Sequence, residues 1–167
     1  MPVRPVVRLP DPVLKRMAEP ISEIGPDELA LAADLLDTME ASPSCVGVAA
    51  PQIGVSRRAF CVDVTGHKKA DSCHGAFVLF NPVLLVAAHA DLAREGCLSV
   101  PDLTGNVARA TEVVMQGITP EGATRVIEAN AFEARALLHE LDHLDGMLFI
   151  DRVGSLATDV FRRKRYR

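Results

Sequence analysis

The chain has 167 residues, of which 49% are hydrophobic and 24% are charged. This length suits one folded domain, and this composition excludes a disordered chain. Eighteen Lys and Arg against 22 Asp and Glu give a formal net charge of −4, and aromatic residues make up only 4%. Such a chain has no overall attraction to nucleic acid and few rings on which bases can stack, so we expect no DNA partner.

Signals for export or membrane insertion are not recognisable in the sequence. Residues 1–10 contain three prolines and two arginines, without an apolar segment before a cleavage site. The most apolar stretch, residues 76–88, is interrupted by Asn81-Pro82 and is too short to span a bilayer. Four cysteines are too few for a disulfide scaffold. We therefore expect a cytoplasmic protein with reduced thiols and no membrane partner.

The first part of the chain predicts two helices. Residues 11–19 form a short helix that Asp11-Pro12 opens, and a longer helix begins at Pro26-Asp27 and ends before Ser42. The apolar face of the longer helix is predicted from three- and four-residue spacing, at Leu29, Ala32, Leu36 and Met39.

The middle of the chain predicts strands, because Val, Phe and Thr are frequent and turn dipeptides separate the runs. The predicted strands are Arg58–Val64, Ala76–Val86, Val107–Gly117 and Thr124–Ala129. Residues 131–144 return to helical periodicity, with Gly146 as the stop signal. Helix, strands and helix in this order predict a single α+β domain over residues 1–167, with residues 156–167 as a basic tail.

The last predicted helix carries the motif H-E-x-x-H, with its defining residues at His139, Glu140 and His143. Histidines four residues apart project from one face of a helix, so both imidazoles can bind one metal ion. Glu140 lies about 100° round the helix, where its carboxylate can take a proton from bound water. The alternative is a pair of solvated or core histidines on an amphipathic helix.

A metal site needs a third protein ligand, and no His or Cys follows His143. Upstream, Cys97 lies in the segment E-G-C-L-S, residues 95–99, where Gly96 allows a tight backbone. A thiolate suits Fe(II), Zn or Ni, whereas a buried apolar thiol is the more common fate of a free cysteine. Spacing alone leaves both interpretations open.

A third segment, residues 47–52, reads G-V-A-A-P-Q. Its small residues let the backbone approach a ligand, and the Gln52 side-chain amide can donate to a developing oxyanion. A packing loop of small residues explains the segment equally well.

In this order and at these distances, the three segments resemble the motifs of the peptide deformylase family, G-x-G-x-A-A-P-Q, E-G-C-L-S and H-E-x-D-H. Here they read C-V-G-V-A-A-P-Q over residues 45–52, E-G-C-L-S over 95–99 and H-E-L-D-H over 139–143. Their flanks agree as well, and the resemblance extends over residues 3–155. It implies small antiparallel or mixed β-sheets packed around a central metal-binding helix.

The resemblance implies that the metal ligands are Cys97, His139 and His143. It implies Fe²⁺ as the ion in the cell, with Zn²⁺ or Ni²⁺ as substitutes. The substrate would be the N-terminal formylmethionine of a nascent polypeptide, and water would attack its formyl carbonyl and release formate. Glu140 would be the general base, while the Gln52 amide and the Leu98 backbone N–H would bind the oxyanion.

By the same resemblance, the nascent peptide pairs with the main chain at Val46 and Gly47 like an added strand. The methionine side chain needs an apolar pocket, and by position our candidates for its lining are Val46, Phe132, Ala136 and the ring of His139. Ordinary packing of a helix on a sheet explains Phe132 and Ala136 equally well.

Charged residues near the motifs predict a supporting network. Glu95, Arg109 and Asp142 are expected to form ion pairs that hold the Cys97 segment against the metal-binding helix. The alternative is that Arg109 is a solvated strand residue.

Two residues depart from the family pattern. Cys45 replaces the first glycine of the first motif, which strains the backbone if that position needs a positive φ. Its thiol would also narrow the cleft or make the enzyme sensitive to oxidation. Leu138 replaces a frequent Gln before the first metal histidine and removes one possible supporting hydrogen bond.

The last seven residues, 161–167, carry five positive charges. A solvated, disordered tail is the usual explanation of such a run, and attraction to ribosomal RNA near the peptide exit is the more specific one.

Two other classes of function share part of this pattern. A metalloprotease or another metal-dependent amide hydrolase uses the same H-E-x-x-H, and a metal-stabilised binding module would keep the fold without turnover. A structural metal site has four protein ligands and needs no base, so Glu140, Gln52 and a count of only three ligands favour an enzyme.

Overall fold

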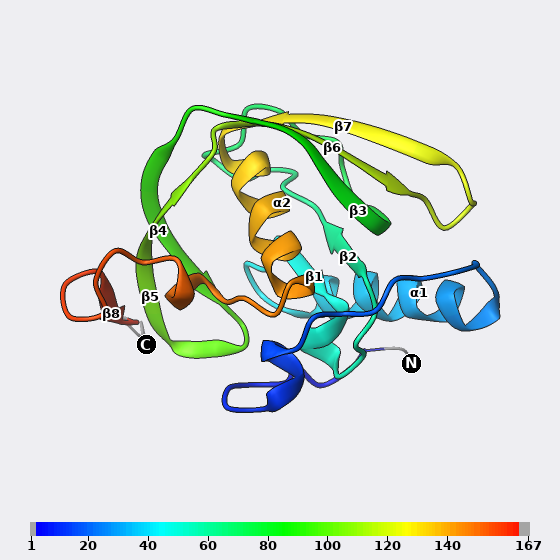
Figure 1. Ribbon diagram of the computed structural model, residues 1–167, viewed down its shortest axis with the longest axis horizontal. Helices are drawn as coiled ribbons and strands as arrows, with labels where there is room; N and C mark the ends of the chain where they lie inside the picture. Colours follow the sequence, from blue (N-terminus) through cyan, green and yellow to red (C-terminus); the bar gives the residue numbers. More distant parts are fainter. Residues whose placement is uncertain (1–2, 164–167) are drawn as a thin grey trace.

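The computed structural model describes residues 3–163, and helix α2 (Ala131–Leu144) lies at its centre (Figure 1). A second helix, α1 (Pro26–Ala41), lies at the periphery. Three short 3-10 helices accompany them in the described residues, η1 (Pro12–Lys15), η2 (Ala50–Ile53) and η3 (Phe149–Asp151). None of the helices in residues 3–163 is long and apolar enough to cross a membrane.

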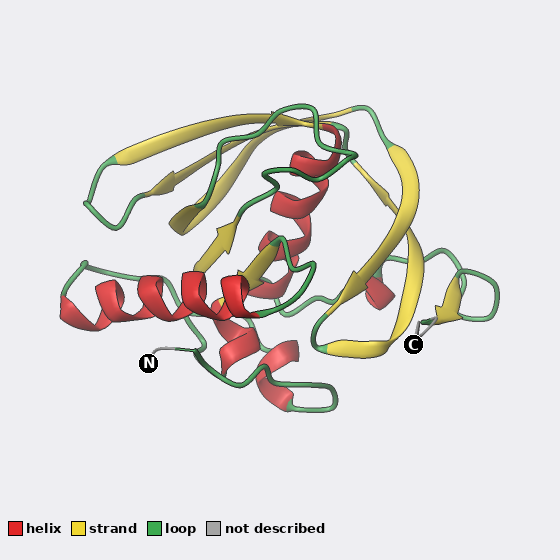
Figure 2. Ribbon diagram, turned by 180° about the vertical axis from the view of Figure 1, so that it is seen from behind, coloured by secondary structure: helices red, strands yellow, loops and turns green. Residues whose placement is uncertain are grey.

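The strands of the described chain form two antiparallel sheets. The larger sheet has the order β1-β2-β3-β6-β7, with the bounds β1 (Gly47–Ala49), β2 (Ala59–Val62), β3 (Phe77–Ala88), β6 (Glu112–Ile118) and β7 (Thr124–Asn130). The smaller sheet has the order β4-β5-β8, with β4 (Asp91–Cys97), β5 (Val100–Arg109) and β8 (Val160–Arg162). Figure 2 shows the two sheets on different sides of α2.

The larger sheet is buried on both faces at its β1–β3 end, which fixes where α2 lies. Along β2, Phe60 faces the core beneath α2 with Leu137, whereas Cys61 faces the core beneath α1 with Leu35. Alternate side chains of a strand point to opposite faces, so this strand is apolar throughout. Helix α2 is thereby held against β1 and β2, next to the ends of β4 and β5.

The ends of α2 agree with the predicted helix over residues 131–144. Gly146, which follows the helix, has φ +76, in the left-handed region that glycine tolerates. A Cβ at this position would lie 2.8 Å from the Lys15 carbonyl oxygen, so a larger residue could not end the helix here without displacing η1.

The predicted α+β class with sheets around a central helix is confirmed, while several element boundaries were wrong. Residues 107–117 do not form one strand, because β5 ends at Arg109 and β6 begins in the other sheet at Glu112. Strands β1, β4 and β8 were not predicted, and the helix over residues 11–19 is limited to η1.

The predicted apolar face of α1 also needs correction. Leu29 is 50% exposed, whereas Leu31 and Leu35 are buried. Apolar residues are frequent on two sides of this helix, so three- and four-residue spacing did not distinguish the side that meets β2 and β3.

Candidate metal centre and active site

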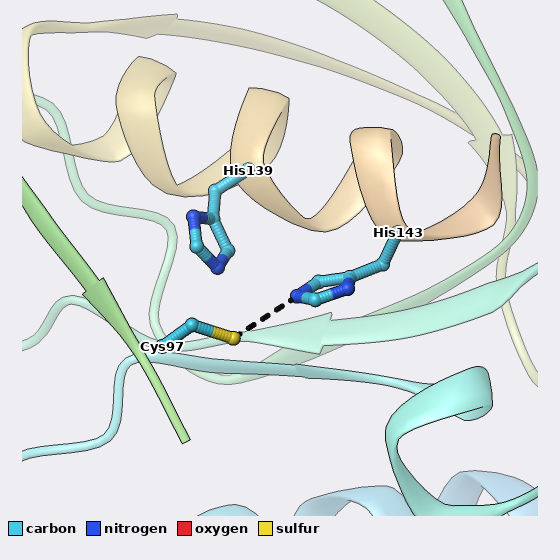
Figure 3. Close-up of side chains that lie close together, drawn as sticks. All are labelled: Cys97, His139 and His143. Carbon is cyan, nitrogen blue, oxygen red and sulfur yellow. Dashed lines mark hydrogen bonds between the residues drawn. The ribbon is translucent and has the colours of Figure 1, made fainter. Parts of the chain in front are cut away.

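Three side chains with metal-binding atoms meet where α2 passes the end of β4. His139 and His143 lie one turn apart on α2, and Cys97 is the last residue of β4 (Figure 3). One potential ligand atom from each lies within 4.8 Å of the other two, and the Cys97 Sγ is 3.4 Å from the His143 Nε2. One thiolate and two imidazoles form a donor set that suits Fe(II), Zn or Ni, and three ligands leave a position open.

The ring of His139 is oriented by a carboxylate. Its Nδ1 lies 2.8 Å from the Glu95 Oε1, so its Nε2 is turned toward Cys97 and His143. A carboxylate on the far nitrogen of a ligand histidine fixes the ring and raises its basicity. The orientation of the His139 ring therefore fits a metal ion, as do the types of the three residues.

The thiol of Cys97 is biased toward its metal-binding form. Burial alone would raise its pKa, but the imidazoles of His143 and His139 hold the pKa of Cys97 well below its usual value. The thiolate is the form that binds metals.

Glu140 lies beside the three ligands with its carboxylate almost completely enclosed. The residue is 3% exposed, and the Oε1 atom has no hydrogen-bond partner in the described part of the chain. Burial raises the pKa of Glu140 above its ordinary value, while the neighbouring histidines oppose this rise. A buried carboxyl with a raised pKa is suited to exchanging a proton with a reacting group.

The close approach of β1 to Glu140 requires a glycine. A Cβ at Gly47 would lie 2.7 Å from the Glu140 Oε2 and 3.0 Å from its Cδ. Gly47 has an ordinary φ, so steric contact with the carboxylate, not backbone conformation, explains the glycine.

Gln52 and Leu98 place two N–H groups next to the thiolate. The Ala49 backbone N–H donates to the Gln52 Oε1 at 2.9 Å, which leaves the Nε2 atom 3.4 Å from the Cys97 Sγ and 3.3 Å from the Ser99 Oγ. The Leu98 backbone N–H donates to no protein acceptor among residues 3–163. Both groups lie near the site where charge would develop. Within the described residues the Leu98 N–H is free there, whereas the Gln52 amide already donates to the Cys97 Sγ and the Ser99 Oγ.

A cavity of about 450 Å³ opens onto these residues. Its lining includes all four residues predicted to bind substrate, Val46, Gly47, Phe132 and Ala136. Val46 and Phe132 also pack against the core beneath α2, and Ala136 belongs to that core. The predicted pocket and the alternative of ordinary core packing therefore describe the same side chains.

The predicted ion network is present and almost completely buried. Arg109, 5% exposed, binds Glu95 through its Nε and Nη2 atoms at 2.8 and 3.0 Å, and it also binds Asp142. The alternative of a solvated Arg109 is wrong. Arg135 was missed: its Nη1 donates to Glu95 at 2.6 Å and to the Val107 carbonyl at 3.0 Å. Its position one turn before His139 on α2 was the signal available in the sequence.

The two departures from the family pattern leave the site intact. Cys45 does not have a positive φ, and the left-handed residue is Ser44 with φ 60, so the expected strain at Cys45 is absent. The Cys45 Sγ donates to the Gly47 carbonyl at 3.2 Å, and burial raises the pKa of this thiol to about 11. Leu138 packs at the edge of the core beneath α2.

A helix that carries H-E-x-x-H, a cysteine ligand from a neighbouring strand and a buried carboxylate together define a metal-dependent hydrolase. The profile of the polypeptide deformylase family matches residues 3–159. The chain belongs to this family, whose members are enzymes that remove the N-formyl group from nascent peptides.

Individual relatives agree with this assignment over nearly the whole chain. A peptide deformylase from Halothermothrix orenii is 43% identical over 160 residues, which cover 96% of this chain and 99% of that protein. The crystal structure of a peptide deformylase from Legionella pneumophila is 35% identical, with a TM-score of 0.83 over 92% of this chain and 88% of that one. The Ehrlichia chaffeensis enzyme in complex with actinonin is 28% identical, with a TM-score of 0.87 over 94% and 92%.

Proposed function

We propose that Glu140 is the general base with which this chain hydrolyses the formyl amide of an N-terminal formylmethionine. The observation that carries this assignment is the buried Glu140 Oε1, which has no partner among the described residues and lies beside Cys97, His139 and His143. Water adds to the formyl carbon, the C–N bond breaks, and the products are formate and a free amine on methionine.

The three ligands are proposed to hold Fe²⁺ in the cell, and Zn²⁺ or Ni²⁺ suits the same donor set. The ligand atoms are the Cys97 Sγ and one imidazole nitrogen from each of His139 and His143. When bound, such an ion polarises a carbonyl and lowers the pKa of a water molecule.

Glu140 moves the proton in both halves of the reaction. Its carboxylate accepts a proton from the attacking water and then gives that proton to the leaving nitrogen. The raised pKa of Glu140 makes the second transfer easier, because a carboxyl that is too acidic would hold no proton to return.

Gln52 and Leu98 are proposed to stabilise the oxygen of the formyl group as it becomes negatively charged. The Gln52 Nε2 is held in place by the bond that its Oε1 accepts from Ala49, so it is oriented before substrate binds. The loss of one such preorganised donor lowers kcat by about 10²–10³-fold in other enzymes.

The nascent peptide is proposed to bind along β1, which is the terminal strand of the larger sheet and has one edge unpaired in that sheet. An extended peptide can add to such an edge through main-chain hydrogen bonds at Val46 and Gly47. The methionine side chain would enter the cavity between Phe132 and Ala136.

We also propose that the whole chain, residues 1–167, is one catalytic domain that acts in the cytoplasm close to the ribosome. The family match over residues 3–159 supports the first point, and a substrate that emerges from the ribosome supports the second.

The predicted tail over residues 156–167 is partly a strand, β8, and residues 164–167 lie outside the described chain. Cosedimentation with ribosomes at low salt that is lost at high salt is expected, and no cosedimentation at low salt would contradict this contact.

A substrate comparison tests the proposed reaction against hydrolysis of other amides. Iron-loaded protein prepared without oxygen should release formate from a formyl-Met peptide and should leave the acetyl-Met and unmodified peptides intact. Actinonin, which is bound in the Ehrlichia chaffeensis structure, is expected to bind this chain as well. Cleavage of internal peptide bonds would instead indicate a metalloprotease.

A further inference from the structure

Five Lys and Arg side chains of the described chain line the cavity. Arg135 is buried and bound to Glu95, and the other four lie at the mouth and have no part in the reaction above: Lys68, Lys69, Arg94 and Arg163. We call them the basic rim. The two carboxylates that line the same cavity, Glu95 and Glu140, are both buried. The accessible part of the lining is therefore positive, although the chain as a whole has a formal net charge of −4.

The lysines of the basic rim belong to a loop that is fixed over the start of α2. The ring of His67 stacks on Phe132, with centroids 3.8 Å apart and an interplanar angle of 6°. Further along the loop, the buried Glu133 accepts hydrogen bonds from the Ser72 hydroxyl and the His74 backbone N–H, each at 2.8 Å. The loop between β2 and β3 is thus tied to α2 at two places, which holds its lysines at the cavity.

The arginines of the basic rim are positioned by the smaller sheet. The Arg94 guanidinium lies 3.8 Å from the centroid of the Phe161 ring of β8, and its Nε donates to the Asn106 Oδ1 at 3.1 Å. Arg163 follows β8 and lies against Gly96, where a Cβ would overlap its guanidinium. Within residues 3–163, no member of the basic rim forms an ion pair with a carboxylate.

We propose that the basic rim selects substrates that carry acidic side chains in the residues following formylmethionine. This proposal rests on the proposed deformylation, because the same peptide places its formyl group at Glu140 and its next residues at the mouth. An extended chain rises by about 3.3 Å per residue, so the side chains that follow methionine leave the cavity past these cations. Four uncompensated positive charges attract carboxylates there.

The position of the basic rim favours a peptide over RNA as its partner. The four cations line the cavity that contains the metal ligands and Glu140, and two of them lie on a loop tied to Phe132 of the predicted methionine pocket.

The experiment compares two peptides that differ only in charge, formyl-Met-Ala-Asp-Asp-Ser and formyl-Met-Ala-Asn-Asn-Ser. Their dissociation constants are measured on metal-loaded Glu140→Gln protein, in which turnover does not disturb binding. The Asp peptide is expected to bind about fivefold more tightly at an ionic strength of about 0.02 M, and the difference should vanish at about 0.5 M.

Charge-removing variants then assign the preference to the basic rim. In the Glu140→Gln background, Arg94→Gln and the pair Lys68→Gln with Lys69→Gln should each lower the Asp-to-Asn affinity ratio toward one. Arg16→Gln is the matched control, because Arg16 is exposed and does not line the cavity. It should leave the ratio unchanged.

Equal affinities for the two peptides at low salt would overturn the proposal. It would also be overturned if Arg16→Gln lowered the Asp-to-Asn affinity ratio as much as the variants of the basic rim do. Binding of a short RNA that is lost in the rim variants, without a difference between the peptides, would assign the rim to RNA and would also overturn it. Formate release from the Asn peptide by the unmodified protein reports separately on the proposed deformylation.

Discussion

The glycine at position 47 shows how one missing side chain positions the proposed general base. Since a Cβ there would lie 2.7 Å from the Glu140 Oε2, Gly47→Ala must push this carboxylate away. Small displacements of a reacting group cost about 10²-fold in rate in other enzymes, so we expect kcat to fall by about this factor. Formate release measures kcat, and metal analysis should show unchanged metal content. A kcat within twofold of the parent protein would contradict this account of Gly47.

Cys45 is predicted to be a slow-reacting thiol despite its position in the cavity. The thiolate is the reactive form, and burial raises the pKa of Cys45 to about 11, so little thiolate is present near pH 8. Alkylation of Cys45 should therefore rise as the pH increases toward about 11. Mass spectrometry after iodoacetamide treatment at pH 8 should find the exposed Cys73 modified first. Faster modification of Cys45 than of Cys73 would contradict the prediction.

At the scale of elements, Arg109 joins β5 to β4 and to α2. Its removal would leave Glu95 and Asp142 buried with fewer partners, and breaking such a buried pair costs about 3–5 kcal/mol. We expect Arg109→Ala to lower the free energy of unfolding by about this amount and to release the metal during dialysis, because Glu95 orients His139.

The matched control is Arg4→Ala. Arg4 pairs with Asp34 near the surface, where an ion pair is worth only about 0–1 kcal/mol, so urea unfolding should change little. Unchanged metal content in dialysed Arg109→Ala would show that the network does not support the metal ligands.

The same network explains which elements the sequence could predict. Helix α2 was predicted with its observed ends, because its periodicity, its metal-binding histidines and Gly146 are all local signals. Strand β4 was missed because Glu95, one of the two residues that it buries, is charged, and this charge is compensated by Arg109 and Arg135 from other elements. The pattern of polar and apolar residues within one segment does not show that a charge will be neutralised by residues from other elements.

At the scale of the whole molecule, two sheets and a helix bring together motifs that lie far apart in the sequence. Gln52, Cys97 and His143 come from η2, β4 and α2, yet the Gln52 Nε2 and the His143 Nε2 both lie 3.4 Å from the Cys97 Sγ. The resemblance of three short motifs was sufficient to predict this centre. The basic rim was not predicted, because its members come from three segments whose proximity depends on the packing of β8 and the β2–β3 loop.

Metal-dependent deformylation with Glu140 as the general base is the reaction on which the other residue roles depend. The most direct test is formate release from a formyl-Met peptide by iron-loaded protein prepared without oxygen, measured beside Glu140→Gln with the metal content of both proteins determined. We predict turnover by the unmodified protein and a rate about 10²–10⁴-fold lower in Glu140→Gln at equal metal content. Comparable formate release by the metal-loaded variant, or none by the metal-loaded parent protein, would contradict it.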